Sequence, residues 1–115
     1  MTTGPLEIQE QIARDGFRRV TLLGELDLYS AATLRQRLDQ LADSAQPVRL
    51  DLSRLEFADS TGMAVLVAAL DSATGHRRRI EVEPQLSPHV ERIVELWGAA
   101  AYLWPERGGR LSPSA

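Results

Sequence analysis

The 115-residue sequence contains neither cysteine nor lysine. Without cysteine, no disulfide framework and no thiolate metal site can form, and the composition suits a reducing compartment, so we expect a cytoplasmic protein. All thirteen basic residues are arginine, and the net charge is −3. This balance argues against direct binding of nucleic acid.

Long apolar runs are missing as well. The longest near-apolar stretch, residues 62–70, is much shorter than the roughly 20 residues that a membrane-spanning helix needs. Residues 1–7 lack the basic start and apolar centre of a signal peptide. We therefore expect a soluble chain that does not insert into a membrane.

What is present fits one ordinary folded domain. Apolar residues make up 43% of the chain and charged residues 25%, which are typical globular values. A chain of this length has room for one core. We expect residues 1–107 to form a single domain and residues 108–115 to form a disordered tail.

The apolar pattern predicts the elements of an α/β fold. Alternation of apolar and polar residues predicts four strands, at residues 6–12, 17–23, 48–52 and 79–83. The third continues loosely to residue 57, and the first two form a hairpin. Helical spacing between capping and stop residues predicts three helices: from an N-cap at Ser30 to Pro47, from the turn at 59–62 to Gly75, and from Ser87 to Gly98. Residues 99–104 fit either a short strand or packed coil. The order predicts a mixed sheet of about four to five strands, and its polar outward positions place the helices on one face.

The turn Asp59-Ser60-Thr61-Gly62 is the strongest candidate site. It follows a strand and opens a helix, so free backbone N–H groups and the positive end of the helix dipole meet there. A phosphoryl group on Ser60 would add roughly −1.5 to −2 charges and would block docking of a partner without unfolding the domain. The alternative is that Ser60 or Asp59 only caps the helix.

Two neighbouring features accompany this turn. The helix after it is apolar on both sides, which indicates either an exposed interface or a covering helix. Glu25 and Asp27 end a strand and would border Ser60 if the two loops lie side by side. Their alternative role is turn and capping chemistry.

Enzymatic constellations are absent from the sequence. His76 and His89 fall in different elements, without the spacing of metal ligands or of a Ser–His pair, and no glycine-rich phosphate loop occurs. We expect no catalysis, no metal and no cofactor, and the oligomeric state stays open.

The segments Gly24-Glu25-Leu26-Asp27, 51–57 and Asp59-Ser60-Thr61-Gly62, in this order, resemble the STAS family, especially its bacterial anti-sigma factor antagonists. The resemblance extends from residue 6 to residue 103. It implies a single-domain STAS fold with helices packed on one face of a mixed sheet.

The resemblance also implies a partner-switching function. The unphosphorylated protein would bind an anti-sigma factor that is also a serine kinase, and so release a sigma factor for transcription. The kinase would phosphorylate Ser60, or less readily Thr61, and a serine phosphatase would restore binding. The partner surface would include Glu25, Asp27, Asp59, Ser60, Thr61, Gly62, Met63 and Val65.

A second group of STAS proteins offers an alternative. Its members are non-catalytic subunits attached to the ATPase of a lipid-transporting ABC complex, and the run at 51–55 with the apolar helix resembles them too. In such an assembly the turn at 59–62 would contact its partner permanently, without phosphorylation.

Overall fold

The computed structural model describes residues 4–44, 46–75 and 79–105, and for residues 72–75 it describes the backbone alone. The tail predicted at 108–115 and His76 lie outside these ranges. The elements are β1 (Glu7–Ile12), β2 (Arg18–Leu26), α1 (Leu28–Asp43), β3 (Val48–Leu52), β4 (Leu55–Ala58), α2 (Ser60–Gly75), β5 (Ile80–Leu86), α3 (Pro88–Trp97) and α4 (Ala100–Leu103).

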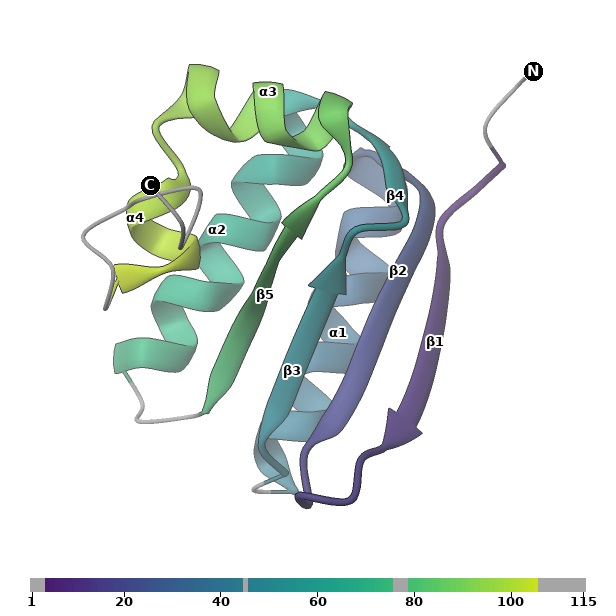
Figure 1. The fold of residues 1–115 in the computed structure, drawn as a ribbon, viewed down its shortest axis with the longest axis vertical. Coiled ribbons are helices and arrows are strands. Elements are labelled where there is room, and N and C mark those ends of the chain that lie inside the picture. Colours follow the sequence, from purple (N-terminus) through teal and green to yellow (C-terminus); the bar gives the residue numbers. More distant parts are fainter. Residues whose placement is uncertain (1–3, 45, 76–78, 106–115) are drawn as a thin grey trace.

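The strands form one mixed sheet of five strands, as predicted. Its order is β1-β2-β3-β5, and β4 pairs with β2 beyond the end of β3. The hairpin of β1 and β2 is antiparallel, and the pairings of β2 with β3 and β4 and of β3 with β5 are parallel. Helices α1 and α2 lie behind the sheet, α3 crosses its end and α4 lies beside α2 (Figure 1).

The core follows from alternation along the strands. On β2, Val20 and Leu22 are fully buried, whereas Arg19 before them is exposed and Thr21 between them is half-buried. The apolar stripe of α1 consists of four buried residues: Ala31, Leu34, Leu38 and Leu41. One face of the sheet and one stripe of the helix therefore make a single apolar layer.

Neighbouring helices account for the apolar surface of α2. The helix contacts α1 on one side and α4 on the other. Met63, Leu66 and Leu70 are buried, and so is Ala69 from the second apolar side. The sequence left open whether the second apolar side of this helix is an exposed interface or is covered by another helix. The structure supports the covering helix.

The segment predicted as one strand over 48–57 is divided in two. The Asp51 carboxylate accepts a hydrogen bond from the Ser53 N–H (2.9 Å) and another from the Ser53 hydroxyl (2.7 Å). This local turn bends the chain between β3 and β4. Because of the bend, β4 takes up pairing with the later part of β2.

Asp51 is only 5% exposed, and its environment predicts a pH-dependent contribution to stability. Burial raises its pKa, but hydrogen bonds from Ser53 and the charge of Arg19, 3.1 Å away, more than offset this, so the pKa lies below the ordinary value. A lowered pKa means that the ionised group stabilises the fold above the pKa of the unfolded chain, and that this stabilisation is lost as the pH falls through the folded value.

We therefore expect Asp51→Asn to lower the free energy of unfolding by about 1–2 kcal/mol at pH 7. The difference from wild type should shrink below about pH 4, where unfolded aspartate becomes protonated. Urea unfolding at several pH values measures both quantities. Glu81→Gln, in an exposed ion pair, is the control and should cost less than about 0.5 kcal/mol. A pH-independent difference would show that the charge of Asp51 does not matter.

The C-terminal helices follow their predicted boundaries in part. Ser87 caps α3, Pro88 is its first residue, and Gly98 ends it in the left-handed conformation (φ 64°), as predicted. The sequence of residues 99–104 fitted a short strand or packed coil, but the structure forms the helix α4 there. It forms because Leu103 and Trp104 pack into the core, where the Trp104 indole N–H donates to the Val82 carbonyl (3.0 Å).

Candidate functional site

The ends of β2 and β4 meet at the carboxyl edge of the sheet. Glu25 pairs with Phe57 and Leu26 with Ala58. Just beyond, the Asp59 N–H donates to the Leu26 carbonyl oxygen (3.1 Å). Since β2 leads into α1 and β4 leads into α2, both helices begin at this edge (Figure 1). The structure thus brings the strand end at 24–27 beside the turn at 59–62.

Asp59 caps α2 and leaves Ser60 free. Its carboxylate accepts the Gly62 N–H (2.7 Å), and its carbonyl accepts the Met63 N–H (2.9 Å). Ser60 is the first residue of the helix and is exposed, and within the described ranges no hydrogen bond involves its hydroxyl. The capping role therefore belongs to Asp59, and the Ser60 hydroxyl is open to chemistry.

Gly62 is buried and lies tightly against β2. A Cβ atom at this position would lie 2.5 Å from the Leu26 carbonyl oxygen and 2.8 Å from its carbon. Atoms cannot approach so closely without displacing the backbone. Glycine at position 62 is thus what allows the first turn of α2 to pack onto the end of β2.

Three members of the predicted partner surface are covered wholly or in part by other atoms, and the buried Gly62 is one of them. Met63 is fully buried, which corrects its placement on that surface: it is the fourth residue of α2 and belongs to the apolar core. Val65 is half-buried and packs against the core. Ser60 and Thr61 are exposed, and Asp59 is partly exposed.

The start of α1 differs from the predicted N-cap at Ser30. Asp27 is the N-cap, because its carboxylate accepts the N–H groups of Ser30 (3.0 Å) and Tyr29 (3.1 Å). Ser30 is the third residue of the helix, and its hydroxyl accepts the Asp27 N–H (2.9 Å). Hydrogen bonds from the N–H and hydroxyl of Ser30, and then from the N–H of Tyr29, lower the pKa of Asp27. The carboxylate is therefore ionised at neutral pH.

Three carboxylates at this edge, Glu25, Asp27 and Asp59, are named here the acidic rim. None of the ion pairs found in the described part of the chain includes a member of the rim. Elsewhere on the sheet, by contrast, Glu10 pairs with Arg37 and Glu83 with Arg19. Among the described residues, no cation thus forms an ion pair with the rim.

The first turn of α1 adds exposed apolar surface that the sequence pattern did not indicate. Leu28 is 54% exposed and Tyr29 is 83% exposed. Both follow the capping Asp27 directly and lie outside the buried stripe of α1. Recognition of the Asp27–Ser30 capping pattern would have placed them in the first turn. Phe57 is also partly exposed, and its ring stacks on His89 with centroids 4.8 Å apart.

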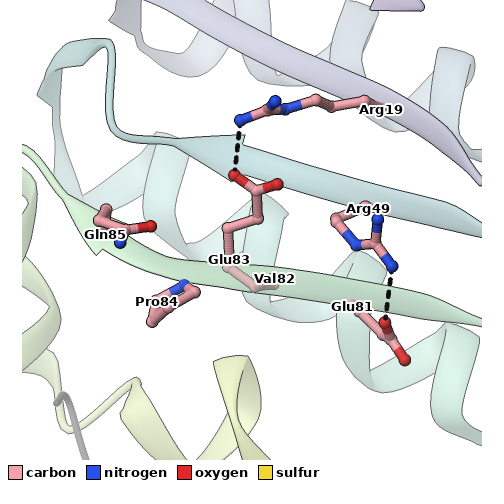
Figure 2. Close-up of a pocket in the computed structure, with 7 residues that line it drawn as sticks. All are labelled: Arg19, Arg49, Glu81, Val82, Glu83, Pro84 and Gln85. Carbon is pink, nitrogen blue, oxygen red and sulfur yellow. Dashed lines mark hydrogen bonds and ion pairs between the residues drawn. The ribbon is translucent and has the colours of Figure 1, made fainter. Parts of the chain in front are cut away.

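A hollow of about 580 Å³ opens on the uncovered face of the sheet. Figure 2 shows its charged side chains in pairs: Glu83 reaches from β5 to Arg19 on β2 (2.9 Å), and Arg49 on β3 meets Glu81 (3.9 Å). The arginines are neutralised by their neighbours. The hollow therefore offers a ligand no unpaired charge, and its lining includes no residue of the turn at 59–62.

Comparison with known proteins gives consistent matches. A family model described as "Mlab, STAS domain" matches residues 11–105. The anti-sigma-B factor antagonist of Bacillus subtilis (strain 168) is 31% identical over 80 residues, which cover 70% of this chain and 72% of that protein.

Solved structures share the fold. An anti-sigma factor antagonist from Mycobacterium paratuberculosis matches with a TM-score of 0.68 and 26% identity, over 82% of this chain and 79% of that one. The phosphorylated form of the Bacillus cell fate determinant SpoIIAA matches in fold with a TM-score of 0.62 at 17% identity, over 84% of this chain and 87% of that one. Within the described ranges of this chain, no helix combines the length and apolarity needed to cross a membrane.

Proposed function

The chain belongs to the STAS domain family, and from this membership and its antagonist relatives we propose that it is an anti-sigma factor antagonist switched off by phosphorylation of Ser60. In the unphosphorylated form it docks on an anti-sigma factor through the acidic rim and the exposed residues Ser60 and Thr61. Docking occupies the anti-sigma factor, and the sigma factor is released to act in transcription.

The exposed hydroxyl of Ser60 is the observation that carries this proposal. Asp59 performs the capping, and the Ser60 hydroxyl is used by no other group in the described structure. If Ser60 capped the helix, its hydroxyl would accept hydrogen bonds from backbone N–H groups. Modifying that hydroxyl would then remove the cap and disturb the fold. Here a kinase can reach the oxygen while the helix start stays intact.

The modification is an ordinary phosphoryl transfer. The Ser60 Oγ attacks the γ-phosphorus of ATP bound to the partner, the bond to the β-phosphate oxygen breaks, and ADP leaves while the hydroxyl proton passes to a base of the kinase. The antagonist is the substrate of this reaction and performs no catalysis. A serine phosphatase reverses it by hydrolysing the phosphate ester.

Electrostatics explains why such a phosphate would act as a switch. The N-terminus of α2 favours an anion through its free N–H groups and dipole, so the modified domain stays folded. The phosphate would nevertheless add roughly −1.5 to −2 charges beside a rim that has no ion-pair partner among the described residues. A partner surface fitted to the unmodified edge would then face bulk and charge that it cannot accommodate.

The direct test is transfer of phosphate by a purified anti-sigma factor kinase from the same organism. With radiolabelled ATP, wild type and Thr61→Ala should be labelled, and Ser60→Ala should lose at least about 90% of the label, because one exposed hydroxyl is the acceptor. Peptide mass spectrometry locates the phosphate.

Labelling that persists in Ser60→Ala and disappears in Thr61→Ala would move the switch to Thr61. If wild type forms a stable complex in its native cell and carries no phosphate on either residue, the constitutive subunit of an ABC transporter or another assembly becomes the better description.

A further inference from the structure

We propose that Tyr29, supported by Leu28, is the apolar anchor with which this protein docks on its anti-sigma factor, and that the partner offers an apolar recess edged by arginine or lysine. The inference rests on the proposed function and extends it to the chemistry of the partner. It assigns a binding role to residues outside the turn at 59–62.

Neither Tyr29 nor Leu28 belongs to the apolar core of the domain. Tyr29 is 83% exposed and Leu28 is 54% exposed, while the apolar stripe of α1 that holds the fold is buried. The backbone N–H of Tyr29 takes part in capping, but its ring is not needed for that hydrogen bond. Tyrosine is enriched among the residues that dominate binding energy, because its rigid ring buries much apolar area at little entropic cost.

The anchor lies at the same edge as Ser60. The Leu26 carbonyl oxygen receives the Asp59 N–H, so the end of β2 touches the start of the turn. Tyr29 follows Leu26 by three residues, a separation of at most about 11 Å along an extended chain and less in a helical turn. A partner that covers Ser60 can therefore cover Tyr29 in the same interface.

The charge of the edge specifies what must surround the recess. Burying a carboxylate under a partner is costly unless a cation accompanies it. The acidic rim has no arginine partner in the described structure, in contrast to the paired carboxylates of the hollow on the open face. The cations must therefore come from the partner, placed around the pocket for Tyr29.

A second exposed apolar cluster supplies a matched control. Leu96, Trp97 and Tyr102 are 75%, 43% and 49% exposed, on the end of α3 and on α4. Figure 1 shows α4 and α1 on opposite sides of α2. Tyr29 and Tyr102 are the two tyrosines of the chain, so one substitution can be compared at two exposed sites that differ in their distance from the rim.

The experiment measures binding of the purified anti-sigma factor kinase, loaded with a non-hydrolysable ATP analogue, by isothermal titration calorimetry. Tyr29→Ala should weaken binding about tenfold or more, whereas Tyr102→Ala should change it less than about twofold. Tyr29→Phe should bind nearly as wild type, since the ring supplies the contact. Thermal unfolding of each variant shows that the fold is retained.

Salt and charge variants test the nature of the partner surface. Wild-type affinity should fall as ionic strength rises, and Glu25→Gln should reduce this dependence more than Glu95→Gln on α3 does. Equal salt dependence in both variants would contradict the cationic recess.

The possible failures are distinct. If Ser60→Asp weakens binding but Tyr29→Ala binds as wild type, the anchor is wrong and the proposed function stands. Equal losses from Tyr29→Ala and Tyr102→Ala also overturn the anchor. If the kinase does not bind wild type at all, the proposed function fails and the anchor fails with it.

Discussion

Phosphorylation of Ser60 is expected to weaken binding of the anti-sigma factor kinase by at least about 100-fold, equivalent to roughly 2.7 kcal/mol. The phosphate is introduced at an exposed helix start, beside the acidic rim formed by Glu25, Asp27 and Asp59. A partner surface fitted to the small Ser60 hydroxyl has no room for a phosphate, and burying such an anion without a cation placed for it costs several kcal/mol. No contact inside the domain has to break.

The mimic Ser60→Asp carries a smaller charge and should weaken binding by more than tenfold, or about 1.4 kcal/mol. Gln11→Glu is the control, because it changes the net charge equally at an exposed position of β1 that pairs with Arg19, near the opposite end of β2 from Glu25. Calorimetry on phosphorylated, mimic and control proteins gives the three affinities. The melting temperature of the mimic should stay close to that of wild type.

Equal affinity for wild type and Ser60→Asp, with the phosphorylated protein also unaffected, would end the switching mechanism. A mimic that binds as wild type while the true phosphate abolishes binding would leave the switch intact and show that its full charge and size are required.

Gly62→Ala should have the largest effect on the fold itself. The new Cβ would lie 2.5 Å from the Leu26 carbonyl oxygen, so the first turn of α2 must move away from β2. That movement strains the hydrogen bond between Asp59 and Leu26 and displaces Ser60 from its place beside the rim. We expect a loss of about 3 kcal/mol in the free energy of unfolding, or roughly 10 °C in melting temperature.

Gly98→Ala provides the comparison. Gly98 has a φ of 64°, and open space surrounds it, so alanine there meets only the cost of the left-handed backbone, about 1 kcal/mol. Chemical denaturation and the rate of phosphorylation of both variants should be measured. Gly62→Ala should lose both stability and phosphorylation, and Gly98→Ala should keep normal phosphorylation. A stable, normally phosphorylated Gly62→Ala would show that the close approach is unimportant.

The sequence alone determined the features that depend on nearby residues. Alternation identified the strands, and Ser87, Pro88 and Gly98 marked the ends of α3, because caps and turns are made by groups a few residues apart. The turn at 59–62 was recognisable as a helix start for the same reason, although the sequence left open whether Ser60 or Asp59 caps the helix. The N-cap of α1 was predicted at Ser30, three positions after the actual N-cap, Asp27. The error is small because both residues can cap a helix, and Asp27 accepts the N–H of Ser30.

Tertiary structure decided what depends on residues far apart in the chain. Pairing of β4 with β2 brings the turn at 59–62 to the strand end at 24–27, and α1 and α4 pack on the apolar helix α2. Met63, which was expected at the partner surface, is buried in the core. The exposure of Tyr29 likewise depends on which surface its neighbours leave open. Local sequence patterns predict the hydrogen bonds within a turn or cap. They do not specify which distant strand or helix packs against a given element. The docking edge is made of such long-range contacts, so only the tertiary structure could define it.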